Sequence, residues 1–568
     1  MRFRVPSLFL SLYLGYNNLA NLYMIYIHRI LVIFFCLFFS TVSAQKVGLV
    51  LSGGGAKGLT HIGIIRALEE NNIPIDYVTG TSMGAIIGSL YAMGYSPDDM
   101  EKLIRSEDFK RWYSGGIQEK YIYYFKRNPP TPEFINIRVS LKNPLHKVKT
   151  QFLPSSVVDP LQMNLAFVEL FGQATALCRG NFDKLFVPFR CVASDVYNKR
   201  PIIFKEGDLG DAVRASMSFP GMFKPIEIDS VLAYDGGIYN NFPVNVMTEN
   251  FHPDIIIGSV VSSNPGKPQE GDIIGQLESM IMQKTDYSVP DSTGILMTFK
   301  YDDVSLMDFN RFDELHDIGY ERTMELMDSI KNRIPRRMDY RLLEKERMAF
   351  KKKMPEFRFR NIIIHGANDQ QKKYIRKEFH SEEDGTFSLE ELRKGYFRLM
   401  SSDNMISEII PHAVYNPYEN DFNLDLKVRM KDDLSLRVGG NVGSNGANQV
   451  YVGATYHNLN NFSKEFSLDG QLGQIYNNLQ LAGRIDLPTR TDLIPAGGFL
   501  VYVRLPEAGK TLEQRKYSHF QQAKRRVCEA ICLHAFPEPP ESRIWYRSRP
   551  TGGPVFPDQR HRFYFRYT

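Results

Sequence analysis

The chain has 568 residues, too many for one compact domain, and this length predicts roughly three or four domains of about 150 residues each. With 69 Lys and Arg against 64 Asp and Glu, the net charge is only +5, too weak for the dense basic footprint of a nucleic-acid-binding protein. A hydrophobic fraction of 43% excludes wholesale disorder, and five cysteines exclude a disulfide-dense scaffold.

The first segment has the features of an export signal. Residues 30–40 form an apolar run (ILVIFFCLFFS), too short to span a membrane and typical of a signal-peptide core. The small residues of Val42-Ser43-Ala44 then supply a cleavage site. We predict a signal peptide over residues 1–44, with a true start at Met24; an N-terminal membrane anchor is the alternative.

Strands and helices alternate in the next part of the chain. Apolar runs such as Val47–Leu51 predict buried strands, and amphipathic stretches such as His61–Glu70 predict helices. This alternation predicts an α/β domain with a largely parallel central sheet. Charged helical sequence continues to Arg337, so we place this domain at residues 45–337 and a linker at residues 338–354.

Three further segments follow the linker. Residues 355–430 read as a strand, two helices and two strands, which predicts a small α+β module. Residues 431–505 carry period-two segments broken by Asn and Gly, a pattern typical of transmembrane β-strands and also compatible with a soluble sandwich. Only four or five such strands are expected, against a minimum of about eight for a closed barrel. Residues 506–568 form an atypical Arg- and Pro-rich tail.

A glycine-rich loop, Ser52–Gly58 (SGGGAKG), follows the first strand and opens a helix. Gly53, Gly55 and Gly58 match the dinucleotide-binding fingerprint, and Asp76 lies close to the expected distance for a ribose contact. The bare amides of such a loop can hold an oxyanion equally well. By itself this loop leaves a dinucleotide-binding enzyme and an acyl-transfer enzyme open.

The second glycine turn, Gly80–Gly84 (GTSMG), lies between a predicted strand and a predicted helix. Gly-x-Ser-x-Gly in this setting is a nucleophile elbow, which indicates Ser82 as a nucleophile. Asp235 follows an apolar strand and precedes two glycines, so it is a candidate base. A Ser–Asp–His order would add His252, and His61 is the other candidate histidine.

Four blocks in this order, SGGGAKGLTHIG, GTSMG, ASMSFPGMFKP and YDGGIYNNFPV, resemble the patatin-like phospholipase family over roughly residues 46–337. The resemblance implies a three-layer α/β fold and hydrolysis of a phospholipid or other acyl lipid with no cofactor and no metal. It also implies a Ser–Asp dyad with no catalytic histidine. Its site residues would be the nucleophile Ser82, the base Asp235, the oxyanion-hole amides of Gly53, Gly54 and Gly55, and the elbow glycines Gly80 and Gly84.

Residues 355–430 are similar to a POTRA module, and residues 431–505 resemble the start of a bacterial surface-antigen barrel. Together with export, this implies a phospholipase A-like enzyme at the outer membrane, in the periplasm or on the cell surface. A homo-oligomer is compatible with this arrangement, and no nucleic-acid partner is expected. A translocation component whose front domain only binds lipid stays open as an alternative.

Two smaller questions stay open at this point. Cys178 and Cys191 could pair in an oxidising compartment or remain buried thiols. Four apolar or small side chains could line a substrate pocket or simply pack in the core: Thr79, Met83, Met217 and Phe219.

Overall fold

The structure is a computed structural model that describes residues 45–118, 131–141, 156–267, 273–301, 303–379, 385–401, 405–443, 448–473, 477–486 and 496–505, with the short pieces 27, 29, 121, 149–150 and 270–271. The predicted signal peptide, apart from two positions, and the predicted tail lie outside the described residues. Among the helices that are described, none is both long enough and apolar enough to cross a lipid bilayer.

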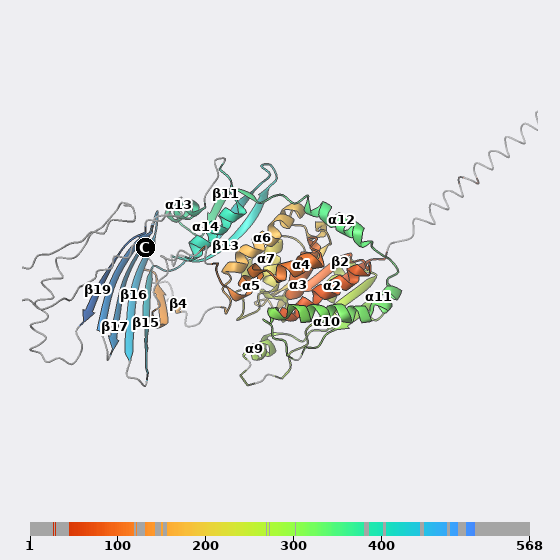
Figure 1. Ribbon diagram of the computed structural model, residues 1–568, viewed down its shortest axis with the longest axis horizontal. Helices are drawn as coiled ribbons and strands as arrows, with labels where there is room; N and C mark the ends of the chain where they lie inside the picture. The colour runs from red at the N-terminus through yellow and green to blue at the C-terminus, as the bar shows by residue number, and fades with distance from the viewer. Residues whose placement is uncertain are drawn as a thin grey trace, which may run out of the picture.

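The first of three sheets has eight strands and forms the core of the right-hand part of the molecule in Figure 1. Five parallel strands lie in the order β10-β9-β1-β2-β5, and β8, β7 and β6 join antiparallel at one side. The sheet is therefore mixed, and its parallel part is the one that the sequence predicts. The strands are β1 (Val47–Leu51), β2 (Tyr77–Thr81), β5 (Phe189–Asp195), β6 (Arg200–Phe204), β7 (Ile226–Ile228), β8 (Val231–Asp235), β9 (Ile255–Val260) and β10 (Gly294–Thr298).

Strand β1 is apolar along its whole length because both faces of this sheet are covered. Leu49 and Leu51 belong to the main core, whereas Val50 packs in a separate cluster with Met247. A Cβ on Gly48 would lie 2.5 Å from the sulfur of Met247, so glycine lets the covering helix approach closely. The sheet therefore forms the middle layer of an α/β domain, as predicted.

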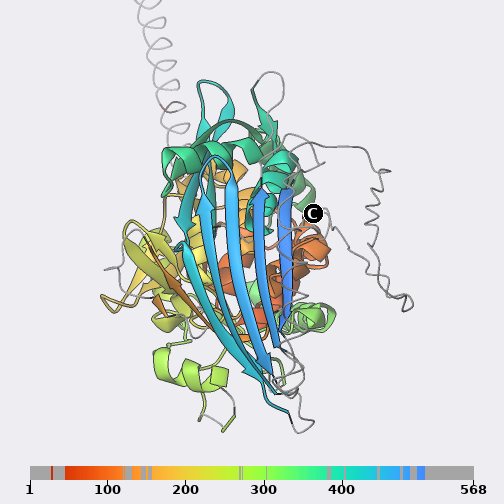
Figure 2. The ribbon, with the colours of Figure 1, turned by 90° about the vertical axis from the view of Figure 1, so that its left-hand side faces the viewer.

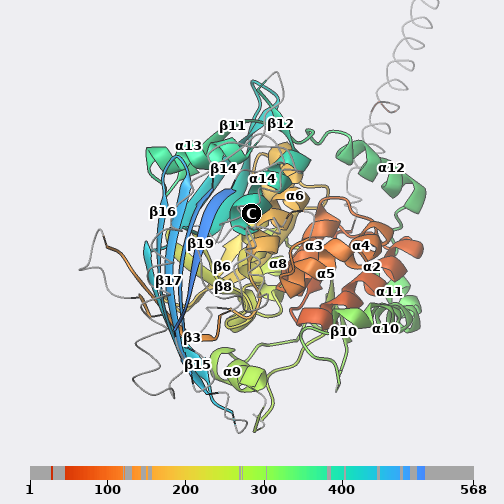
Figure 3. The same cartoon turned by 60° about the vertical axis from the view of Figure 1, so that its left-hand side comes forward.

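Helices surround this sheet, and Figure 3 shows α2, α3, α4, α5 and α10 grouped on one side of it. One of them, α12, lies in the segment predicted to be a linker. Its Arg347 is buried and pairs with Glu69 of α2, so this segment packs onto the first domain. The helices are α2 (Thr60–Glu70), α3 (Met83–Ala92), α4 (Pro97–Ile104), α5 (Glu107–Ser114), α6 (Leu161–Cys178), α7 (Leu209–Ser216), α8 (Val244–Phe251), α9 (Ile273–Ile281), α10 (Phe312–Glu325), α11 (Met327–Arg333) and α12 (Tyr340–Lys351).

A second, four-stranded sheet with two helices follows, with the strand order β12-β11-β14-β13. It packs on α6, which is apolar on two sides: Phe171 faces the first core and Leu165 faces the second. The predicted strand, two helices and two strands are present in that order, with one further two-residue strand, β12, between the helices. The POTRA assignment itself stays a prediction. The elements are β11 (Arg358–His365), α13 (Asp369–Glu378), β12 (Phe387–Ser388), α14 (Leu389–Ser401), β13 (Ile406–Asn416) and β14 (Asp421–Met430).

The third sheet has seven strands in the order β19-β18-β17-β16-β15-β3-β4 (Figure 2). Five of them lie in the segment predicted to form strands, whereas β3 and β4 come from the first domain, between α5 and α6. The sequence did not predict this exchange, and the barrel assignment stays a prediction. The strands are β3 (Glu133–Val139), β4 (Lys149–Thr150), β15 (Leu434–Asn441), β16 (Gln449–Leu459), β17 (Ser463–Gly473), β18 (Asn477–Asp486) and β19 (Ala496–Leu505).

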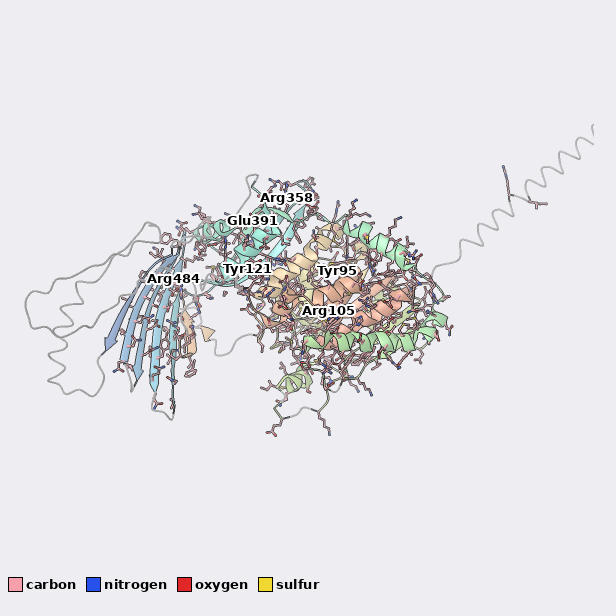
Figure 4. All side chains as sticks on the ribbon, in the orientation of Figure 1. Tyr95, Arg105, Tyr121, Arg358, Glu391 and Arg484 are labelled. Carbon is pink, nitrogen blue, oxygen red and sulfur yellow. The ribbon has the colours of Figure 1, made fainter. Side chains whose placement is uncertain are left out.

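Between α5 and β3, Tyr121 packs against the second module. Tyr121 stacks on Phe397 of α14, with 5.0 Å between ring centroids, and its hydroxyl donates a hydrogen bond of 3.3 Å to Glu390. Figure 4 labels this tyrosine between the third sheet and the α/β domain. The three sheets are thus tied together by one segment of the first domain.

Candidate active site

Ser82 lies at a sharp turn between β2 and α3. Its backbone has φ 53° and ψ −121°, a conformation that a non-glycine residue adopts only when its surroundings hold it there. A Cβ on Gly80 would lie 2.3 Å from the carbonyl oxygen of Gly84, and one on Gly84 would lie 2.4 Å from that of Leu51. Only glycine fits at both positions, and the turn can therefore present the Ser82 side chain beyond the end of the strand.

Two strands that meet end to end bring Ser82 and Asp235 together. Strand β6 occupies one edge of β5, so β2 and β8 share the other edge. The parallel strand β2 ends with Thr81 opposite Val192, and the antiparallel strand β8 ends with Asp235 opposite Ala193. Because Ser82 directly follows Thr81, the two side chains leave neighbouring positions along this edge.

The hydroxyl of Ser82 donates a hydrogen bond of 2.7 Å to Oδ2 of Asp235. The other carboxylate oxygen accepts one of 2.7 Å from the amide of Gly237, and the Asp235 side chain is only 5% exposed. Burial raises the pKa of Asp235 from 3.8 to about 6 against the opposing effect of these two hydrogen bonds, and the charge of Glu278 adds to the rise. Such a carboxylate is a stronger base than an ordinary aspartate and is still mostly ionised at neutral pH.

Two serines at the end of α7 and just after it hold both members of this pair in place. The Ser216 hydroxyl accepts a hydrogen bond of 3.0 Å from the amide of Ser82 and donates one of 2.6 Å to the carbonyl oxygen of Val192. The carbonyl oxygen of Ser218 accepts one of 3.0 Å from the amide of Asp235. Sequence reasoning assigned no role to these serines; their only signal was a place in the block ASMSFPGMFKP.

The glycine loop lies beside Ser82, with one difference from the expected set of donors. The amide of Gly53 donates a hydrogen bond of 3.1 Å to the carbonyl oxygen of Asn241, so it is already engaged. Within the described part of the chain, the amides of Gly54 and Gly55 have no acceptor, and both glycines line the pocket that contains Ser82. Gly55 has φ 57°, a left-handed conformation that aims successive amides to one side.

Apolar side chains form most of the pocket around Ser82 and Asp235. Met83, Ile86 and Leu90 line it from α3, and their spacing places them on one helix face that runs for about 10 Å from the nucleophile. Aromatic and aliphatic residues of α5, α6 and the loop after α7 complete the wall: Phe109, Trp112, Met163, Phe167, Met217 and Phe219. Of the four predicted candidates, Met83, Met217 and Phe219 thus line the pocket, whereas Thr79 is buried in the core, where its hydroxyl bonds to Pro243.

Neither candidate histidine contacts the Ser82–Asp235 pair. His61 is fully buried beneath the loop, bonded to the Ser259 hydroxyl at 2.8 Å and to the Ser52 carbonyl oxygen at 3.0 Å. Burial lowers its pKa to about 4, although the hydrogen bond to Ser52 opposes the fall. His252 is an exposed residue that directly follows α8.

The carboxylate proposed for a ribose contact has other partners. Asp76 accepts a hydrogen bond of 2.8 Å from the amide of Val47 and forms an ion pair with Arg336. It therefore fixes the start of β1 to the segment after α11. This arrangement does not support the dinucleotide-binding alternative.

Two smaller observations concern the cysteines and the residue types that bind metal ions. Cys178 and Cys191 are both buried and free, and burial raises the pKa of each thiol. In the part of the chain that the structure describes, no group of three or more His, Cys, Asp or Glu side chains could hold a metal ion.

Comparison with known proteins identifies a family over the part of the chain that contains this site. The family model described as patatin-like phospholipase matches residues 49–248, a range that contains the glycine loop, the elbow and Asp235. The chain contains a patatin-like phospholipase domain. A domain of this kind is a lipid ester hydrolase domain.

Curated relatives resemble the same part of the chain. "Lysophospholipase NTE1" of Candida albicans is 24% identical over 319 residues, 51% of this chain and 20% of the relative. "Patatin-like phospholipase domain-containing protein ZK370.4" of Caenorhabditis elegans is 31% identical over 207 residues, 36% of this chain and 13% of that protein. The chain therefore spans about a fifth or less of the length of these relatives.

Solved structures give a weaker likeness. VipD from Legionella pneumophila is 15% identical, with a TM-score of 0.29, over 50% of this chain and 67% of that chain. The ExoU–SpcU complex of Pseudomonas aeruginosa is 18% identical, with a TM-score of 0.26, over 50% of this chain and 52% of that chain.

Proposed function

We propose that the patatin-like domain hydrolyses the carboxylic ester of an acyl lipid, with Ser82 as nucleophile and Asp235 as general base. The observation that carries this proposal is the 2.7 Å hydrogen bond from the strained Ser82 to the buried Asp235. A paired hydroxyl and carboxylate with this geometry can form an acyl-enzyme without a histidine between them. The pair lies in an apolar pocket, beside two amides that have no acceptor among the described residues.

The first half of the reaction forms the acyl-enzyme. Asp235 takes the proton of the Ser82 hydroxyl as the oxygen attacks the ester carbonyl carbon. The amides of Gly54 and Gly55 donate to the carbonyl oxygen as it becomes negative, a contribution of about 10²–10³ in rate for each such donor. When the tetrahedral intermediate collapses, the C–O bond to the alcohol breaks, and Asp235 returns the proton to the departing alkoxide.

The second half releases the fatty acid. Asp235 takes a proton from a water molecule, and the resulting hydroxide attacks the acyl carbon. Collapse of this second intermediate breaks the bond to Oγ of Ser82, which recovers its proton from Asp235. The carboxylate returns to its starting state, so each turnover consumes one ester and one water.

The shape and composition of the pocket support a lipid substrate. The α3 face of Met83, Ile86 and Leu90 offers an apolar path that starts at the nucleophile. An acyl chain is the substrate part that such a path binds through the hydrophobic effect. The name lysophospholipase of the curated relatives supports a phospholipid-derived ester.

We further propose that the protein is exported and attached to the outer membrane through its third sheet. Register places Val438, Val452 and Leu479 on one face of this sheet and Leu436, Leu468 and Leu481 in the next row. All six are exposed, which is costly in water and expected against lipid. The export signal predicted for residues 1–44 supports the same location.

The opposite face of the third sheet supports this orientation. Arg437 donates to Asp469 at 2.6 Å, and the hydroxyl of Tyr451 donates to the same carboxylate at 2.7 Å. Tyr451 is 1% exposed, whereas Leu468, next to Asp469 in the chain, is 47% exposed. Polar residues are thus covered and apolar residues are bare, the reverse of a sheet built for water.

Replacement of the nucleophile tests the enzymatic proposal. Ser82→Ala should abolish hydrolysis of a short acyl ester and labelling by a fluorophosphonate that reacts with activated serines. The control is Ser89→Ala in α3, whose hydroxyl donates to the carbonyl oxygen of Ile86 and takes no part in the Ser82–Asp235 pair. Unchanged turnover in Ser82→Ala would refute the nucleophile. A wild-type protein that binds lipid vesicles without any labelling would instead favour the lipid-binding translocation component.

A further inference from the structure

Helix α9 belongs to a flap that leaves and re-enters the patatin-like domain at one point. The Asn264 side chain joins the two ends of this flap by two hydrogen bonds to Thr285. Its Nδ2 donates to the Thr285 carbonyl oxygen at 3.0 Å, and its Oδ1 accepts from the Thr285 backbone amide at 2.7 Å. Figures 1 and 3 show α9 standing away from the central sheet at the end of this excursion. The helix is thus held at its base and extends from the domain.

One side of this flap belongs to the substrate pocket. Glu278 and Met282 line the pocket together with Ser82 and Asp235. After the helix, the amide of Gln283 donates a hydrogen bond of 2.8 Å to the carbonyl oxygen of Ile238, three residues after the base. The inner side of α9 therefore forms a wall of the pocket beside the reacting groups.

On the opposite side of α9, two apolar side chains are bare. Ile273 is 77% exposed and Met280 is 83% exposed. They are seven positions apart, about two helical turns, so both side chains lie on one face. An exposed apolar helix face is unusual on a water-soluble surface and typical of a helix that lies in a lipid interface.

We propose that the Ile273–Met280 face of α9 is the surface by which the patatin-like domain docks on a lipid surface to draw in its substrate. This inference rests on the proposed lipid hydrolysis, because the same short helix lines the acyl pocket on its inner side. A substrate whose chains are held in a membrane must leave that membrane at the pocket. Exposed apolar side chains on the helix whose other side borders the pocket would give the acyl chain apolar contact close to the reacting groups.

The test compares two double variants of the full-length protein. Ile273→Ser with Met280→Ser removes the proposed surface, and Leu342→Ser with Met348→Ser on α12 removes two other exposed apolar side chains. Each protein is given vesicles of phosphatidylethanolamine and phosphatidylglycerol, and separately a short, water-soluble acyl ester. Co-sedimentation with the vesicles and fluorophosphonate labelling are measured in parallel.

The α9 variant should hydrolyse vesicle lipid at least tenfold more slowly at low lipid concentration, with a raised KM, and should co-sediment less. Its turnover of the soluble ester and its labelling should equal those of the α12 variant and the parent. The proposal would be overturned if the α9 variant hydrolysed vesicle lipid and co-sedimented as the parent does. It would also be overturned if the only change in this variant were its oligomeric state. Equal loss on both substrates would mean that α9 supports the pocket instead. A parent protein that neither labels nor turns over the soluble ester would refute the proposed enzyme, and co-sedimentation would still decide the docking.

Discussion

The first and third sheets of this protein bury their side chains in opposite ways. In the first sheet β1 is buried on both faces, and the acidic group that matters, Asp235, lies at a strand end in an apolar pocket. In the third sheet, acidic Asp469 is covered and paired with Arg437, while neighbouring Leu468 is exposed. Alternation along a strand thus reveals two faces but does not reveal which of them meets water.

Asp235 and Asp469 make this difference testable, because replacing each with asparagine should change the stability of the protein in opposite directions. Asp235 has no ion-pair partner among the described residues, and burial raises its pKa from 3.8 to about 6. The folded protein therefore binds this proton more tightly than the unfolded chain, so the carboxylate destabilises folding increasingly as the pH rises from about 4 to about 6 and fully above it.

Asp235→Asn should therefore lower kcat/KM on a soluble ester on the order of 10³-fold or more, because no base remains for Ser82. At pH 8 the same variant should be more stable, by on the order of 1–3 kcal/mol, since a neutral amide avoids the cost of a buried charge. Steady-state kinetics and urea unfolding measure the two effects. A variant that keeps its activity would exclude Asp235 as the base.

The first and third sheets also differ in the space around their glycines. A Cβ on Gly236 would lie 2.1 Å from the carbonyl oxygen of Val192 in β5, whereas one on Gly470 in β17 would meet nothing closer than 3.7 Å. We expect Gly236→Ala to reduce stability by about 3 kcal/mol or more and to inactivate the enzyme, since backbone must move where β2 and β8 meet. Gly470→Ala should stay within about 0.5 kcal/mol of the parent. Thermal unfolding of both variants measures these changes in stability. Equal effects would mean that the structure is not closely packed around Gly236, where β2 and β8 meet.

Asp469→Asn should destabilise the third sheet, the reverse of the effect at Asp235. The change removes the nearer of two carboxylates that pair with Arg437, leaving Glu133 at 3.7 Å, and it weakens the hydrogen bond from Tyr451. The group is largely but not wholly buried, so the expected loss is about 1–3 kcal/mol. Proteolysis of the third sheet in detergent, with hydrolysis of a soluble ester as the control readout, measures it. Stability equal to that of the parent would mean that the pair contributes little.

Sequence reasoning succeeded here where the information was local. The apolar run of β1 and the glycines around Ser82 specify their own geometry, because strand burial and a sharp turn depend on neighbouring residues. Contacts between distant segments could not be predicted. Strand β3 pairs with β15, about three hundred residues away, and the pairing of a free strand edge follows from the whole fold. The bond from Gly53 to Asn241, which removes one expected oxyanion donor, is of the same kind.

The smallest expected effect is the pH dependence of kcat/KM, which should depend on Asp235 of the first sheet and not on Asp469 of the third. The carboxylate form of Asp235 is the base, and its pKa is about 6 in the folded protein. The kcat/KM for a soluble ester should therefore be constant above pH 7 and fall about tenfold per pH unit below about pH 6. An ordinary exposed aspartate would put this limb near pH 4. Because the third sheet lies outside the reacting groups, Asp469→Asn should leave the midpoint of the acid limb unchanged. A midpoint near pH 4 in the parent would contradict a buried base, and a midpoint that moves in Asp469→Asn would mean that the two sheets are coupled.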